Sequence, residues 1–124
     1  MDANDFKHKI DEAQKLMSEE DYKKALDLLT TLKNIEKEMD FDYSITHRLY
    51  QLLSNCQSLY NQQVILKCVN NPKLHNKTSI TLHDLKKFLE DDLDIEESIL
   101  GREVELLILR GLLSCKIEGN KIIF

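Results

Sequence analysis

The chain has 124 residues, of which 42% are hydrophobic and 31% are charged, the composition of a globular protein with one modest core. Its 17 basic and 22 acidic residues give a net charge of −5, which argues against non-specific attraction to nucleic acid or anionic lipid. The apolar runs are far shorter than the roughly 20 residues of a membrane span, and the acidic start at 1–5 is unlike a secretory signal. We therefore expect a cytoplasmic or nuclear protein.

The residues that usually carry chemistry are scattered. Cys56, Cys68 and Cys115 show no CxxC spacing and the four histidines show no HxxxH or HExxH pattern, so neither a disulfide framework nor a zinc site is indicated. Cys56 and His47 could in principle form a thiol nucleophile and its base, but no acidic residue is evident that would orient the histidine. The acidic stretch 91–94 lacks the glycine and distal glutamate of a calcium loop. We expect no cofactor, no metal and no enzymatic activity.

The first 40 residues predict two helices joined by a tight turn. Apolar residues recur at helical spacing in 5–17 and again in 22–39, and 18–21 offers capping residues. The pattern around this turn resembles a tetratricopeptide-like junction, but solenoids need about three repeats, so a generic helical hairpin is the favoured alternative. The apolar positions are Phe6, Ile10, Ala13, Met17, Tyr22, Ala25, Leu28, Leu29, Leu32, Ile35 and Met39.

A third helix is expected from about residue 45 to residue 60. The apolar run 64–69 is ambiguous between helix and strand, and we favour a continued helix. Pro72 must interrupt it, because proline lacks an amide hydrogen. The expected organisation is therefore a helical region at 1–72 followed by a winged-helix region at 73–124.

The second region reads as two helices and a hairpin. A capping box, in which Thr81 is followed by Asp84, opens a helix that ends near residue 90. A second helix is expected from residue 95 or 96 to 110, with Gly111 just past its end. Gly119 and Asn120 then suit a two-residue hairpin turn. The expected register pairs Glu118 with Lys121, Ile117 with Ile122, Lys116 with Ile123 and Cys115 with Phe124. The expected fold is thus mainly α, an N-terminal helical hairpin or bundle followed by a small winged helix that ends in a β-hairpin.

Winged helices commonly place their second helix in the DNA major groove. Residues 79–113, however, contain four basic residues and nine acidic ones. The excess negative charge would face the DNA phosphates and repel them. Lys116 and Lys121 on the wing are the candidate phosphate contacts if nucleic acid is the ligand. Nucleic-acid binding is therefore the alternative hypothesis, not the leading one.

Three stretches of this region resemble the PCI domain: Ile-Thr-Leu-His-Asp-Leu at 80–85, the apolar helix end at 103–113, and Lys-Ile-Glu-Gly-Asn at 116–120. That family occurs in the proteasome lid, the signalosome and translation initiation factor 3. The resemblance implies a non-catalytic scaffold subunit that binds protein subunits of a larger complex through the edges of its winged helix.

An exposed strand edge with apolar residues invites pairing with another chain. We therefore expect the terminal strand at 121–124 to serve as a docking edge, together with leucines that broaden the apolar surface of the preceding helix. The candidate protein-interaction residues are Leu106, Leu109, Leu113, Lys121, Ile122, Ile123 and Phe124.

Overall fold

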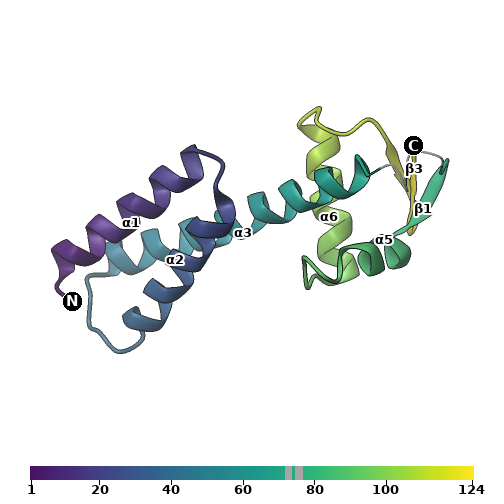
Figure 1. The fold of residues 1–124 in the computed structure, drawn as a ribbon. Coiled ribbons are helices and arrows are strands. Elements are labelled where there is room, and N and C mark those ends of the chain that lie inside the picture. The colour runs from purple at the N-terminus through teal and green to yellow at the C-terminus, as the bar shows by residue number, and fades with distance from the viewer. Residues whose placement is uncertain (72–73, 75–76) are drawn as a thin grey trace. The chain divides into compact units, whose positions relative to one another are not determined.

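We describe a computed structural model, which places residues 1–71, 74 and 77–124. The chain divides into two compact units, Met1–Tyr60 and Asn61–Phe124. The described residues form five helices and a small antiparallel sheet of three strands (Figure 1), so the predicted mainly α fold with a C-terminal β-hairpin is confirmed. The predicted boundary between residues 72 and 73 lies outside the described residues and stays a prediction.

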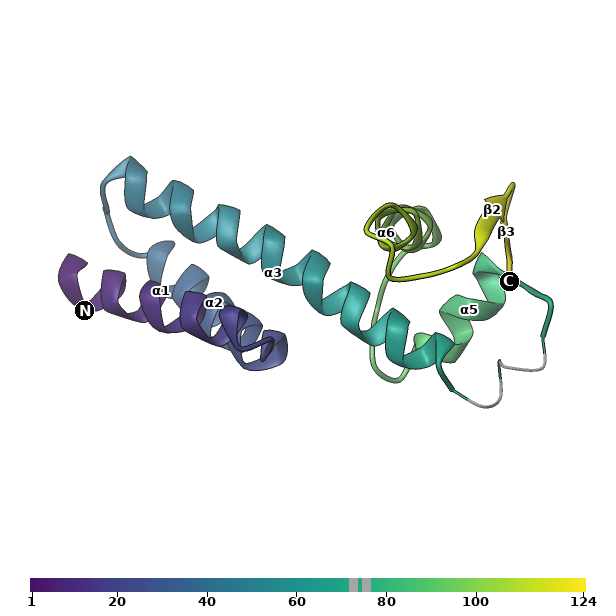
Figure 2. The same ribbon diagram turned by 90° about the horizontal axis from the view of Figure 1, so that it is seen from above.

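The N-terminal unit contains α1 (Ala3–Ser18), α2 (Tyr22–Glu36) and the start of α3 (Tyr43–Val69). Helices α1 and α2 lie side by side as a hairpin (Figures 1 and 2), and α3 completes their core. The buried positions follow the predicted helical spacing, since one face of each helix must leave water. The core residues are Phe6, Ile10, Ala13, Ala25, Leu29, Leu32, Ile45, Leu49 and Cys56.

The turn between α1 and α2 is a Schellman motif. The amide of Asp21 donates to the carbonyl of Leu16 and that of Glu20 donates to Met17, while Glu20 adopts a left-handed φ of 62°. The predicted tight turn is therefore confirmed. The tetratricopeptide-like interpretation stays a prediction.

Two predictions about the ends of helices have different outcomes. Met39 was expected on the apolar stripe of the second helix, but α2 ends at Glu36 and the Met39 side chain is exposed. The amide of Met39 bonds to Glu36 three residues back, and this tighter winding rotates Met39 away from the core. By contrast, α3 continues through 64–69, so the helix favoured for this run is confirmed. The predicted break at Pro72 lies outside the described residues.

The C-terminal unit holds the rest of α3, β1 (Ser79–Thr81), α5 (Leu82–Leu89), α6 (Glu97–Leu109), β2 (Lys116–Glu118) and β3 (Lys121–Ile123). The predicted cap is present, because the Thr81 hydroxyl accepts a hydrogen bond of 3.0 Å from the amide of Asp84. Gly111 has a φ of 74° just past α6, as a Schellman ending requires.

The hairpin has the predicted register in its strands: β2 pairs with β3 through Lys116–Ile123, Ile117–Ile122 and Glu118–Lys121. The sequence did not indicate β1, which pairs with the other side of β3 and gives the strand order β1-β3-β2. The terminal strand is therefore central and has no free edge. The prediction that β3 is a docking edge is wrong, and among the described residues the free edges of this sheet belong to β1 and β2.

The inner face of the sheet carries a row of three directly paired side chains, Ile80, Ile122 and Ile117, which we call the isoleucine row. Ile80 and Ile122 are buried and Ile117 at the edge is half-buried. Strand β1 contacts α5 and strand β2 contacts α6, so the row closes the core of this unit against these two helices. Ser79, Thr81, Lys116, Glu118, Lys121 and Ile123 occupy the outer face.

Candidate protein-interaction surface

Helix α6 has a buried apolar face and an exposed one. Leu100, Val104 and Leu107 are fully buried, whereas Leu106 is 37% exposed and Leu109 is 82% exposed. Leu106 and Leu109 are one helical turn apart and thus neighbours on the surface. Scattered exposed leucines are ordinary, but a leucine this exposed beside other apolar side chains marks a patch that a partner can cover.

Leu109 lies on the rim of a groove between α6 and β2, with a volume of about 380 Å³. Apolar side chains from both elements line most of this groove, and one charge of each sign completes it. We call it the α6–β2 groove. Its lining residues are Glu105, Ile108, Leu109, Cys115, Lys116 and Ile117.

The two charged side chains that line this groove, Glu105 and Lys116, are exposed, and Lys116 is paired locally. Lys116 Nζ lies 3.1 Å from Glu118 Oε1, on the outer face of β2. Glu118 is also the direct partner of Lys121 across the hairpin. Within the groove, partial burial raises the pKa of the Cys115 thiol, which keeps the thiol neutral and a poor nucleophile. The arrangement suits the binding of a polypeptide better than covalent chemistry.

The structure places the predicted interaction residues in three different settings. Leu106 and Leu109 lie on the exposed face of α6, and Leu113 is half-buried beyond its end. Ile122 is 1% exposed in the centre of the isoleucine row. It belongs to the core, so its prediction as a contact residue is wrong. Lys121 and Ile123 offer outer-face side chains on the central strand but no free backbone edge, and Phe124 follows that strand with an exposed side chain.

Several residues of the surface were not predicted. Ile108, Cys115 and Ile117 line the groove, and Leu112 is 49% exposed just past α6. From the sequence, Ile108 was expected only within the helix that ends at residue 110, and Ile117 only within the hairpin. Their juxtaposition depends on how α6 and β2 pack, which the sequence pattern alone does not reveal.

Buried polar residues of the C-terminal unit were also missed. Glu103 is fully buried in α6, with Arg102 Nε 3.8 Å from its carboxylate. Gln62 is buried in α3 and accepts a hydrogen bond from the Arg110 guanidinium. Helical spacing could have revealed Glu103, because it lies three residues after the buried Leu100. The Arg110–Gln62 contact links the end of α6 to α3, whereas the Arg102–Glu103 pair lies within α6.

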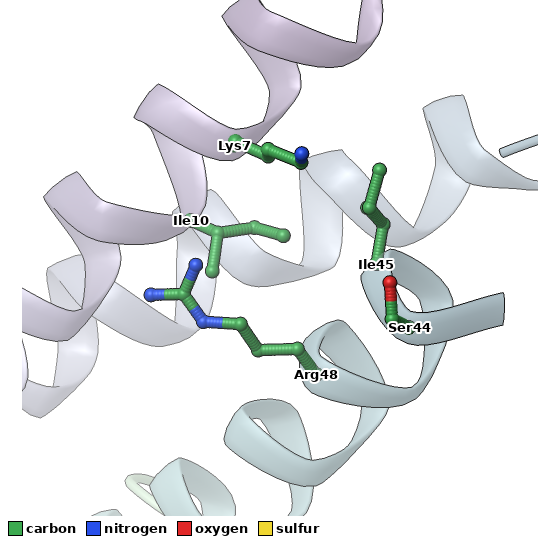
Figure 3. Close-up of a pocket in the computed structure, with 5 residues that line it drawn as sticks. All are labelled: Lys7, Ile10, Ser44, Ile45 and Arg48. Carbon is green, nitrogen blue, oxygen red and sulfur yellow. The ribbon is translucent and has the colours of Figure 1, made fainter. Parts of the chain in front are cut away.

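The N-terminal unit has a smaller recess of about 180 Å³, lined by Lys7, Ile10, Ser44, Ile45 and Arg48 (Figure 3). The Arg48 guanidinium is already bound, at 2.6 Å from Asp11 Oδ1 and 2.7 Å from Gln14 Oε1. These contacts link α1 to α3. The recess is therefore a weaker candidate for a binding site than the α6–β2 groove.

Among residues 1–71, 74 and 77–124, no cluster of three or more His, Cys, Asp or Glu side chains is placed to hold a metal ion. In the same residues, no helix combines the length and the apolar character needed to cross a membrane.

Comparison with protein-family models, curated proteins and solved structures found no match. The resemblance to the PCI domain therefore stays a prediction, carried by the residues quoted above.

Proposed function

We propose that this protein is a non-catalytic interaction module, a scaffold or assembly subunit that binds protein partners through α6 and the free edge of β2. The observation that carries the proposal is Leu109, which is 82% exposed on the rim of an apolar groove. Burial of one leucine side chain is favourable by roughly 1.5–3 kcal/mol, so a partner that covers this rim gains more than from any polar contact nearby.

The free edge of β2 supports the same proposal. It adjoins the groove, so one extended segment could add to the strand and also place apolar side chains against Ile108 and Leu109. The proposed docking edge is therefore that of β2 and not that of the terminal strand. Assembly with PCI-type complexes, and a cytoplasmic or nuclear location, are part of the proposal and rest on the sequence resemblance.

The test is substitution of Leu109 by Asp in the full chain. Tyr43→Asp is the matched control, because Tyr43 is 78% exposed but lies on the N-terminal unit. Each variant is purified from the native cells by an affinity tag, and its stoichiometric partners are quantified. Loss of a defined partner with Leu109→Asp but not with Tyr43→Asp is expected. Equal partner recovery by both variants, with their folds intact by circular dichroism, would refute the proposal.

A further inference from the structure

Strand β2 has its backbone groups arranged to accept one more strand. The amide of Leu82 donates to Asn120 and that of Phe124 donates to Thr78, so residues 120, 122 and 124 direct their backbone groups at β1. Because backbone groups alternate sides along a strand, residues 121 and 123 bond to β2 through Glu118 and Lys116. The amide and carbonyl of Ile117 consequently point away from β3, at the free edge.

The side chains beside Ile117 carry opposite charges. Lys116 and Glu118 are exposed on the outer face, one on each side of it. In an antiparallel pair of two β2 strands centred on Ile117, Lys116 lies opposite the partner's Glu118, and Glu118 lies opposite the partner's Lys116. Opposite charges in directly facing positions stabilise a strand pair. The strand is therefore complementary to itself.

Neighbouring two-fold registers lack this complementarity. Moving the centre by one residue places Lys116 opposite the partner's Lys116, or Glu118 opposite the partner's Glu118. Like charges in directly facing positions are destabilising. In the register centred on Ile117, the next pair along is Cys115 with the partner's Gly119, which brings neither charge nor bulk. The charge pattern thus selects one register.

We infer that the free edge of β2 binds β2 of a second copy of this chain, antiparallel and centred on Ile117. The two sheets join into one of six strands, and the isoleucine row continues through the partner's Ile117 on the same face. Both α6 helices then lie on that face, so the two-fold axis brings Leu109 towards the partner's Leu109. The inference rests on the proposed function, since it names the occupant of the same surface.

Sedimentation velocity of the full chain tests the inference, over protein concentrations from roughly 1 μM to 1 mM, where weak interfaces associate. A dimer is expected for the wild type. Lys116→Glu and Glu118→Lys each turn two attractive pairs into two repulsive ones, and each should raise the dissociation constant about tenfold or more. The control variants Lys87→Glu and Glu90→Lys make the same charge changes on exposed residues of α5 and its end and should dimerise like the wild type.

Mixing the two single variants gives the decisive result. In a mixed dimer, the Lys116→Glu chain has acidic side chains at positions 116 and 118, and the Glu118→Lys chain has basic side chains at both. Every facing pair is then of opposite charge, so an equimolar mixture should recover the dimerisation that neither variant shows alone. The double variant Lys116→Glu/Glu118→Lys should also dimerise, because the swap restores both opposite-charge pairs between the two β2 strands. A monomeric wild type, or single variants that dimerise as well as the controls, would overturn the inference. If the dimer is absent but Leu109→Asp still loses a defined partner, the proposed function stands and only the inference is overturned. If there is neither a dimer nor a Leu109-dependent partner, the inference and the proposed function are both refuted.

Discussion

Ile80 and Ile122 are direct partners across β1 and β3. They are far apart in sequence, since Ile80 lies just before α5 and Ile122 lies two residues from the end. The pairing makes β3 the central strand, since β2 holds its other side. A buried central pair of this kind commits the last residues to the core. The inner face of the sheet therefore closes the core of the unit, and its outer face and its two edge strands remain available for contacts.

Ile122→Ala should lower the free energy of unfolding by about 2–5 kcal/mol, because it opens a cavity at a buried position. Ile123→Ala is the matched control, since Ile123 is half-buried on the outer face of the same strand. It should cost about 1 kcal/mol. Urea unfolding followed by circular dichroism measures both. Equal costs for the two variants would contradict the assignment of the inner and outer faces.

Most of the helical structure could be predicted, because each helix carries its own apolar period and its own end signals. Thr81 and Gly111 are examples in which one residue marks the boundary through a local hydrogen bond or a left-handed φ. The hairpin register was also predictable, since the turn at Gly119 fixes it locally.

Strand β1 could not be predicted in the same way. It has three residues and one buried side chain, Ile80, so it offers no period of its own. Its partner is distant in sequence, and nothing local to either strand specifies the pairing. That single omission caused the wrong assignment of the docking edge to β3. The α6–β2 groove was likewise hidden, because packing between two elements creates it and neither element encodes it alone.

Gly111→Ala should destabilise the C-terminal unit by about 1–2 kcal/mol, because a Cβ atom is unfavourable at the φ of 74° found there. No neighbouring atom would obstruct the added carbon, since nothing lies within 4 Å of it, so backbone strain alone is tested. Ser114→Ala, an exposed position beyond the same turn, should change stability by less than about 0.5 kcal/mol. Thermal unfolding of both variants is the measurement. A neutral Gly111→Ala would contradict a left-handed ending of α6.

The Cys56 thiol predicts a specific loss of stability at high pH. Burial raises its pKa from 9.0 to about 11, and its Sγ lies 3.4 Å from the carbonyl of Tyr22. Between these pH values the folded protein holds the thiol proton that the unfolded chain releases, so the free energy of unfolding falls as pH rises from 9 to 11. Below pH 9 the contribution is fully present.

The measurement is urea unfolding at several pH values for the wild type and for Cys56→Ala. Below pH 9 the variant should be less stable than the wild type, because it leaves a small cavity, and its stability should fall less steeply between pH 9 and 11. The difference in slope isolates Cys56 from other groups that titrate there. Parallel curves for the two proteins would show that the thiol is not buried as described.

Nucleic-acid binding through the wing is the remaining alternative, and the structure predicts that it is weak. Lys116 Nζ lies 3.1 Å from the Glu118 carboxylate, and Lys121 is the cross-strand partner of that same residue. Phosphate contacts would have to form beside this carboxylate, in a chain whose net charge is −5. Fluorescence anisotropy with a labelled DNA duplex and a labelled RNA at low salt should show no saturable binding. Binding that weakens with added salt and with Lys116→Ala/Lys121→Ala, but not with the control Lys87→Ala, would favour the nucleic-acid hypothesis over the protein-binding one.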